Sequence, residues 1–277
     1  MTSNVDEERI FVEERRNRII EILSRKNRAS VAELSQEFRI GEATIRRDLQ
    51  ELENRGLVLR THGGVLVMDT ASRESPLKER ETHNREKKER IAQCIAQFVK
   101  NGESIMIDGG TTTLQIARTL RVRRQLVVIT NCPAIGEQLV GSGDNQVILT
   151  GGELREVTGV AVGPMAEYTV RQYRADRVIL GMSSLIPKEG FFTVNASEAE
   201  LKRVMMRCGK EVIVAMDSSK IGKVTLSFVS DFSLIGKLIT DDGISAEDIH
   251  EIEQRGVEVI AVPSPESPGH QPGRLPR

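Results

Sequence analysis

The chain has few of the residues that build metal sites, disulfide frameworks or base-stacking surfaces. None of its 277 residues is tryptophan and 3% are aromatic, so we expect no platform that stacks the bases of single-stranded nucleic acid. The three cysteines, Cys94, Cys132 and Cys208, are odd in number and far apart, which fits neither a disulfide framework nor a zinc ribbon. The four histidines form no ligand spacing. The sequence therefore predicts no metal and no cofactor.

A long apolar run and an excess of charge of one sign are also missing. No apolar stretch approaches the ~18 residues of a membrane-spanning helix. The acidic N-terminus has no apolar centre of the signal-peptide kind. Lys and Arg total 39 against 40 Asp and Glu, a net charge of −1, which excludes coating of nucleic acid by bulk charge but not a local basic patch. We expect a soluble, cytoplasmic protein of two domains with no membrane partner.

Residues 1–68 predict three short helices and a β-hairpin, the parts of a winged helix-turn-helix domain. Apolar residues at helical spacing mark a first helix within 13–26. A capping box of Ser30 and Glu33 opens the second helix, which runs to residue 38. The third helix spans 42–56, and the alternation of residues 57–67 around two glycines predicts the hairpin.

The predicted third helix has the two faces that a DNA-reading helix needs. Ile45, Leu49 and Leu52 form its apolar face, and polar side chains form the other. A basic, polar helix face can reach phosphates and base edges in the major groove. The candidate DNA-binding residues are Thr44, Arg46, Arg47 and Gln50 on the helix and Arg60 and His62 on the hairpin. The alternative is the solvated face of an ordinary helical domain.

The composition changes after residue 68. Residues 69–90 are charged, mixed in sign and nearly free of large apolar residues, and we interpret them as a linker. Residues 91–262 predict an α/β domain with a largely parallel sheet, because nearly all-apolar strands need helices on both faces. The predicted strands are 104–108, 125–130, 146–150, 177–181, 211–216, 237–240 and 257–262. The proline-rich residues 263–277 are expected to form a disordered tail.

Polar residues follow several of these strands, where open α/β sheets bind ligands. The first strand runs into the sequence DGGTTT, residues 108–113, whose glycines, hydroxyls and helix N-terminal amides suit an anion such as phosphate. A capped strand-to-helix turn explains this run equally well. Glu198 and Lys202 lie four apart on a predicted helix, where an exposed ion pair is the simpler explanation.

The segment SVAELSQEFRIGEATIRRDLQELENRGLVLRTHGGV, residues 30–65, resembles the signature of the DeoR-type family of bacterial transcriptional repressors. The core TIRRDL, the Gly56 that ends the helix and the wing motif R-x-H-G-G all match. The family has serine where this chain has Gly41, directly before the third helix. Glycine is an acceptable N-cap, so we expect only slight fraying there.

Later motifs follow the order of the DeoR-type effector domain across residues 76–241: D-x-G-T-T-T, T-N, G-G, E-A-x-x-K and D-S-S-K. The resemblance implies a domain related in fold to ribose-phosphate isomerases, which binds a phosphorylated sugar or sugar derivative. It implies as binding residues Asp108, Gly110, Thr111, Thr112, Thr113, Asn131, Gly152 and Lys220, with Glu198, Lys202 and Asp217 as weaker candidates.

We therefore expect a sequence-specific regulator that represses genes of sugar or carbohydrate metabolism. It would bind a double-stranded DNA operator as a dimer or higher homo-oligomer. The alternative is a sugar-phosphate isomerase or deaminase with a fused helical domain, since Asp108, Glu198 and Lys220 could supply acid–base groups. A protein-interaction module is a third reading, which leaves the arginine pattern and the Gly/Thr loop unexplained.

Overall fold

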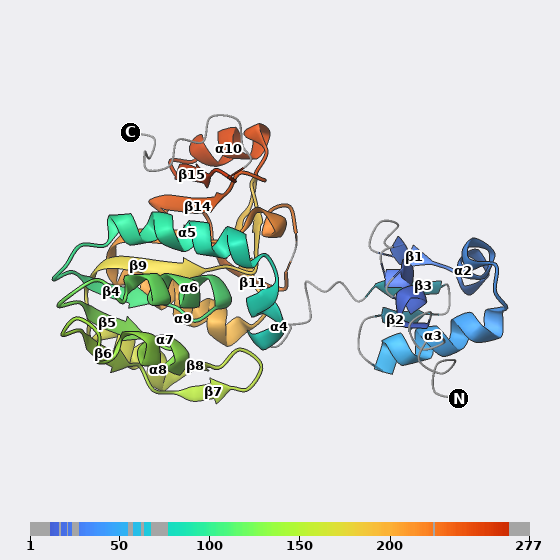
Figure 1. Ribbon diagram of the computed structural model, residues 1–277, viewed down its shortest axis with the longest axis horizontal. Helices are drawn as coiled ribbons and strands as arrows, with labels where there is room; N and C mark the ends of the chain where they lie inside the picture. Colours follow the sequence, from blue (N-terminus) through green and yellow to red (C-terminus); the bar gives the residue numbers. More distant parts are fainter. Residues whose placement is uncertain are drawn as a thin grey trace. The chain divides into compact units, whose positions relative to one another are not determined.

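The chain divides into two compact units, Met1–Arg73 and Glu74–Arg277. The computed structural model describes residues 12–16, 18–20, 22–23, 28–54, 58–61, 64–67, 77–223 and 225–265 (Figure 1). His62 in the predicted wing and residues 266–277 of the predicted tail lie outside the described residues.

The first unit is a winged helix-turn-helix built on a small apolar core. Helical residues from 12 onward precede α2 (Val31–Phe38) and α3 (Glu42–Asn54). Strands β2 (Val58–Thr61) and β3 (Gly64–Val67) pair antiparallel, and β1 (Arg28–Ala29) pairs with β3. The core contains Ile19, Leu23, Leu34, Ile45, Leu49, Leu52, Val58 and Val65. The predicted helix-turn-helix and hairpin are confirmed, whereas β1 was not predicted.

Local hydrogen bonds fix the start of α2 and the turn into α3. The Ser30 Oγ accepts from the Glu33 amide at 3.1 Å, and the Glu33 Oε2 accepts from the Ser30 amide at 2.6 Å, which is the predicted capping box. Arg39 ends α2 in the left-handed conformation, with φ 53°. The Gly41 carbonyl accepts from the Thr44 amide at 2.9 Å, so glycine does stand at the start of α3.

One buried carboxylate ties α3 to the preceding helical residues. The side chain of Asp48 is 3% exposed, and its oxygens accept from Arg15 Nε at 2.6 Å and from Arg16 Nε at 3.0 Å. These contacts fix the rotation of α3 against its neighbour. Asp48, the acidic residue in TIRRDL, therefore has a structural role. The face of α3 opposite to Asp48 is exposed.

The second unit is built on a seven-stranded sheet in which every neighbouring pair is parallel. Its order is β15 (Glu258–Val262), β14 (Lys237–Asp241), β12 (Gly209–Ala215), β9 (Ala175–Gly181), β4 (Ser104–Ile107), β5 (Val127–Thr130) and β6 (Gln146–Leu149). These are the seven apolar runs predicted as strands. The predicted parallel α/β sheet is confirmed.

Helices cover both faces of this sheet, as its apolar strands require. Figure 1 shows α5 (Arg85–Phe98), α6 (Thr111–Leu120) and α7 (Pro133–Leu139) side by side over one face. On the other side, α8 (Pro164–Arg171) packs against α9 (Ala196–Arg207). The short α10 (Ala246–Glu253) contacts β15.

Two small antiparallel sheets lie outside the seven-stranded sheet, and the sequence did not predict them. Strands β7 (Glu153–Arg155) and β8 (Val160–Val162) form a hairpin. Strands β10 (Ser184–Ile186), β11 (Gly190–Thr193) and β13 (Ser227–Ser230) form the other sheet. Each of these strands has only three or four residues, too few to show a clear alternation of apolar and polar side chains.

The start of the second unit lies inside the segment 69–90 that we interpreted as a linker. Helix α4 (Leu77–Thr82) and the first residues of α5 pack within this unit. Lys88 is 3% exposed and its Nζ donates to the His83 carbonyl at 2.6 Å. Because a solvated linker would leave such an ammonium in water, residues 77–90 are part of the folded unit.

Replacement of Asp48 by alanine tests the tie between α3 and its neighbour. Both arginines lose a charge-assisted acceptor, so the free energy of unfolding of the first unit is expected to fall by about 1.5–3 kcal/mol. Urea denaturation followed by circular dichroism measures the change. Glu37→Ala, which removes an exposed carboxylate on α2, is the control and should change it by less than about 0.5 kcal/mol. Equal stability of the two variants would contradict the role assigned to Asp48.

Candidate functional site

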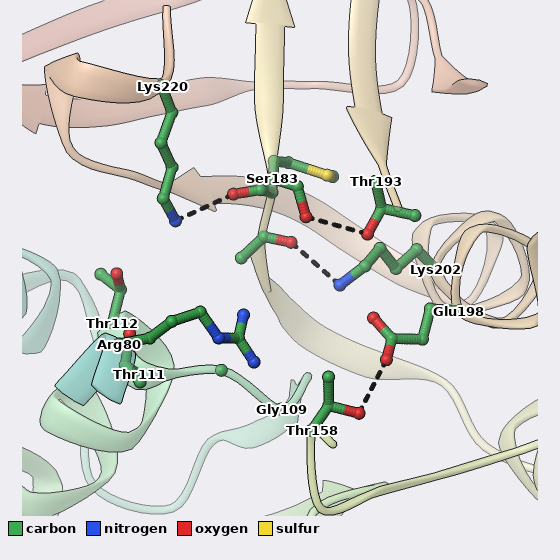
Figure 2. A pocket seen from close by; sticks show the side chains of 13 residues that line it. Arg80, Gly109, Thr111, Thr112, Thr158, Ser183, Thr193, Glu198, Lys202 and Lys220 are labelled. Carbon is green, nitrogen blue, oxygen red and sulfur yellow. Dashed lines mark hydrogen bonds between the residues drawn. The ribbon is translucent and has the colours of Figure 1, made fainter. Parts of the chain in front are cut away.

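A pocket lies at the carboxyl ends of β4 and β9, where the strand order reverses. The chain runs from β4 outward to β5 and β6, then returns to β9 on the other side of β4. Such a switch point leaves a crevice between the connections that leave in opposite directions. The pocket has an empty volume of about 410 Å³, part of which is open to solvent. It is lined by Arg80, Gly109, Gly110, Thr111, Thr112, Thr158, Gly181, Met182, Ser183, Thr193, Glu198, Lys202 and Lys220 (Figure 2).

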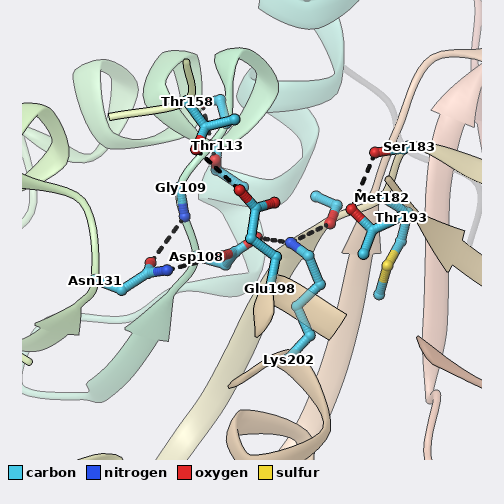
Figure 3. Close-up of polar contacts among 12 residues, drawn as sticks. Asp108, Gly109, Thr113, Asn131, Thr158, Met182, Ser183, Thr193, Glu198 and Lys202 are labelled. Carbon is cyan, nitrogen blue, oxygen red and sulfur yellow. Dashed lines mark hydrogen bonds and ion pairs between the residues drawn. The ribbon is translucent and has the colours of Figure 1, made fainter. Parts of the chain in front are cut away.

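A buried ion pair supports one wall of the pocket, and its lysine is a lining residue. The side chains of Asp108, directly after β4, and Lys202, on α9, are 3% and 4% exposed. Lys202 Nζ donates to the Asp108 carboxylate and, at 2.9 Å, to the Gly181 carbonyl (Figure 3). Burial raises the pKa of Asp108, and the Lys202 ammonium opposes that shift. The pair joins the ends of β4 and β9 to α9.

Asn131, directly after β5, holds the loop that leads into α6. Its Oδ1 accepts from the Gly109 amide at 3.0 Å, and its Nδ2 donates to Asp108 Oδ1 at 3.3 Å. A Cβ at position 109 would lie 2.0 Å from Val160 Cγ1, so only glycine fits this approach. The loop is thus fixed from beneath, by groups that do not line the pocket.

The negative charge of Glu198, at the N-terminal end of α9, is also compensated by neighbouring side chains. The Asn195 side chain caps this helix and accepts from the Glu198 amide at 3.1 Å. The Glu198 carboxylate accepts from Thr158 Oγ1 at 2.9 Å and pairs with Arg155. The β7–β8 hairpin therefore supplies the groups that neutralise the Glu198 charge.

Two cations that line the pocket form no ion pair among the described residues. Lys220 Nζ donates to the Met182 carbonyl at 3.0 Å. Burial lowers the pKa of Lys220 to about 8; the Asp217 carboxylate opposes this shift, while the charges of Lys88, Arg80 and Lys202 add to it. The guanidinium of Arg80 reaches toward the centre of the pocket in Figure 2, and its buried Nε has no hydrogen-bond partner.

Further donors in the pocket are also unused. Thr112 is 2% exposed, and its Oγ1 has no partner. Gly110 stands at the N-cap of α6 and supplies no side chain to its first-turn amides. Buried polar groups are normally hydrogen-bonded. The unused donors and unpaired cations together match a ligand that is an anion and a hydrogen-bond acceptor.

The predicted effector-binding residues divide into two groups in the structure. Those that line the pocket are Gly110, Thr111, Thr112, Glu198, Lys202 and Lys220, whereas Asp108, Thr113, Asn131, Gly152 and Asp217 do not. Gly152 has φ 112°, and a Cβ there would lie 2.5 Å from the Val162 carbonyl oxygen, so the backbone requires glycine. Asp217 accepts from Asn84 Nδ2 at 2.9 Å and caps the turn Ser218–Lys220.

Four polar residues of the pocket were not predicted: Arg80, Thr158, Ser183 and Thr193. Arg80 lies in the segment interpreted as a linker, where its charge resembled that of its neighbours. The other three lie on or beside the short strands that the sequence did not predict. The hydroxyls of Ser183, directly before β10, and Thr193, at the end of β11, are 3.1 Å apart.

The predicted DNA-binding residues of α3 share its exposed face. Thr44, Arg46, Arg47 and Gln50 are exposed, while Ile45, Leu49 and Leu52 are at most 1% exposed. Arg46 Nη2 lies 2.9 Å from Glu42 Oε2 in an exposed pair one turn apart. Gln50 Nε2 donates to Glu53 Oε2 at 3.3 Å. Arg60 lies on β2, and His62 is outside the described residues.

The described residues contain no group of three or more His, Cys, Asp or Glu that could hold a metal ion. Cys94, Cys132 and Cys208 are buried and form no disulfide, and burial raises the pKa of Cys94 to about 11. Within the same described ranges, every helix is too short or too polar to cross a membrane.

Family models match both units. One for a DeoR-like helix-turn-helix domain matches residues 15–71, and one for a DeoR C terminal sensor domain matches residues 83–242. The HTH-type transcriptional regulator GlpR of Haloferax volcanii is 36% identical over 247 residues, 89% of this chain and 96% of that protein. The glycerol-3-phosphate regulon repressor of Escherichia coli K12 is 32% identical over 228 residues, 82% of this chain and 90% of that protein.

Among solved structures, ribose 5-phosphate isomerase A from Methanocaldococcus jannaschii is similar, with a TM-score of 0.37 and 16% identity over 50% of this chain and 55% of that one. The relatives that match along most of the chain are transcriptional regulators, so the isomerase or deaminase alternative is set aside. The chain belongs to the DeoR family of transcriptional regulators, with a helix-turn-helix domain followed by a sensor domain.

Proposed function

We propose that the protein represses genes of sugar or carbohydrate metabolism and is controlled by a phosphorylated sugar bound in the sensor pocket. It acts in the cytoplasm, as a dimer or higher homo-oligomer on paired operator half-sites. The observation that carries the proposal is the positive charge that the pocket leaves uncompensated.

The charges around the pocket do not cancel. Five cations and three carboxylates line the pocket or contact its lining residues: Arg80, Lys88, Arg155, Lys202 and Lys220 against Asp108, Glu198 and Asp217. Two positive charges remain, which match the roughly −1.5 to −2 charge of a phosphate monoester at neutral pH. The unused first-turn amides of α6 and the Thr112 hydroxyl supply donors beside them.

The rest of the lining suits the polyol part of such a ligand. The hydroxyls of Thr158, Ser183 and Thr193 and the carboxylate of Glu198 can exchange hydrogen bonds with sugar hydroxyls. One relative is named as a glycerol-3-phosphate regulon repressor, which supports a small phosphorylated polyol. Five of the predicted residues act indirectly in this proposal, because they hold the loops that carry the lining residues. These five are Asp108, Thr113, Asn131, Gly152 and Asp217.

The exposed face of α3 supplies the DNA contacts. Arg47 has no ion pair or side-chain hydrogen bond among the described residues, so it is available to a phosphate or a guanine edge. The exposed Arg46–Glu42 pair is worth only about 0.3–0.5 kcal/mol and is easily exchanged for a phosphate contact. Arg60 and His62 on the wing remain predicted contacts to the DNA backbone.

Fluorescence anisotropy with the DNA upstream of the protein's own gene tests the proposal. Binding is measured at fixed salt with glycerol 3-phosphate and a panel of pentose and hexose phosphates. One of these esters is expected to change the operator affinity by about fivefold or more. Specific DNA binding with no response to any ester, together with no direct binding of an ester, would contradict the sensor assignment.

Arg47→Ala tests the DNA-reading face. The loss of a base or phosphate contact is expected to weaken operator binding by about 1–3 kcal/mol. Arg121→Ala, which removes an exposed arginine of the sensor unit, is the control and should leave the affinity unchanged. If R47A and R121A bind the operator equally well, Arg47 does not contact DNA.

The pH dependence of effector binding tests the role of Lys220. In the free protein its pKa is about 8, so the ammonium form is lost as the pH rises through 8. A phosphate dianion stabilises the ammonium form, so binding takes up a proton above pH 8 and the affinity falls. The fall between pH 7 and pH 9 is expected to reach about tenfold.

Isothermal titration calorimetry with the phosphate ester measures this profile. The ester is a dianion throughout the range, because its second pKa is about 6. Lys220→Arg keeps the charge at all these pH values and should give a flat profile. A flat profile in the wild type would show that Lys220 does not pair with the phosphate.

A further inference from the structure

Helix α4 connects the sensor pocket to the segment that follows the DNA-binding unit. The Leu77 amide donates to the Val157 carbonyl at 3.2 Å, and Glu81 pairs with Arg118 of α6 at 2.7 Å. The helix is therefore anchored at one end to the β7–β8 hairpin and at the other to α6. Both of these elements also carry residues of the pocket.

Buried polar contacts hold the corner between α4 and α5. Lys88 Nζ donates to the Arg80 and His83 carbonyls, and burial lowers the pKa of Lys88. Asn84, in the left-handed region at φ 54°, donates from Nδ2 to Asp217 Oδ1 at 2.9 Å and to Ser219 Oγ at 3.1 Å. These contacts fix the backbone of Arg80 and leave its side chain free to enter the pocket.

The Arg80 guanidinium makes no hydrogen bond and no ion pair with the described residues, although its Nε is buried. Figure 2 shows it reaching from beside Thr111 and Thr112 into the space that Lys220, Lys202 and Glu198 surround. A guanidinium nitrogen that is buried without a partner is costly unless a ligand completes its hydrogen bond. The neighbouring Thr112 Oγ1 is unpartnered as well, so two independent donors face the same space.

We propose that Arg80 binds the phosphate group of the effector and that this contact makes the position of α4 depend on the ligand. The inference rests on the proposed function of the pocket. Arg80 lies seven positions after Arg73, the last residue of the first unit. A ligand changes a conformational equilibrium only by its differential affinity for the two states. Arg80 supplies that difference in affinity, because its guanidinium reaches the phosphate only while α4 is anchored to the β7–β8 hairpin and to α6.

Arg80→Met in the full-length protein tests the inference, with Arg85→Met as the matched control. Arg85 lies on the same segment, its side chain is 69% exposed, and its ion pair is with Glu89 on the surface. Titration of inorganic phosphate is expected to give a dissociation constant at least about tenfold higher for R80M than for the wild type and R85M. Lys220 and the amides of α6 retain the residual binding.

Amide hydrogen exchange of residues 77–84 separates ligand contact from a merely structural role. Saturating phosphate should slow exchange there in the wild type and R85M, and not in R80M. Without phosphate, R80M should melt at the same temperature as the wild type or higher, because it removes a buried Nε that has no hydrogen-bond partner. A lower melting temperature, or wild-type phosphate binding by R80M, would overturn the inference.

The effect on regulation follows from the same variants. With the sugar phosphate that changes wild-type operator affinity, the response of R80M should fall below about twofold while its ligand-free DNA affinity stays unchanged. A full response in R80M would overturn the inference and leave the proposed function intact. Failure of the wild type itself to bind any phosphate ester would overturn the proposed function and this inference with it.

Discussion

The sensor site depends on the buried pair between Asp108 and Lys202. These residues come from the end of β4 and from α9, on opposite sides of the point where the strand order reverses. Lys202 also binds the carbonyl of Gly181 at the end of β9, so a single ammonium joins the elements that border the pocket. Removal of one partner of such a buried pair leaves an uncompensated charge, which costs about 3–5 kcal/mol. The position of the DGGTTT loop relative to α9 follows from this contact.

The remaining charges are arranged so that the carboxylates near the pocket are already satisfied. Glu198 is neutralised by Arg155 and Thr158, and Asp217 accepts from Asn84 and Ser219. Arg80 and Lys220 are left without an ion pair among the described residues, beside a Thr112 hydroxyl that has no partner. An anion would relieve both the electrostatic and the hydrogen-bonding deficit. The paired charges thus build the frame of the pocket, and Arg80 and Lys220 are left unpaired beside it.

The sequence predicted what depends on local patterns. The seven parallel strands were readable because each is an apolar run between amphipathic stretches, and the Ser30–Glu33 capping box was readable because it is a contact across three residues. The faces of α3 followed from helical spacing, although the structural role of Asp48 did not, since its partners Arg15 and Arg16 lie more than 30 positions away. The strands of three or four residues carried no comparable pattern.

The pocket was predicted only in part, for the same reason. Gly110, Thr111 and Thr112 could be named because they follow a strand directly and begin a helix. Arg80 could not, since only tertiary packing of α4 brings it to the pocket. Gly152 was predicted to bind the effector, but it does not line the pocket. Its positive φ and the close approach of the Val162 carbonyl explain why glycine stands at this position.

We propose that the sensor pocket recognises a phosphate group through its surplus positive charge. Calorimetric titration of the full-length protein with a panel of sugar phosphates and with the corresponding unphosphorylated sugars tests this recognition. At least one phosphate ester is expected to bind, whereas its parent sugar is not expected to bind measurably at the same concentrations. Equal affinity for an ester and its unphosphorylated parent would show that the pocket does not recognise the phosphate group.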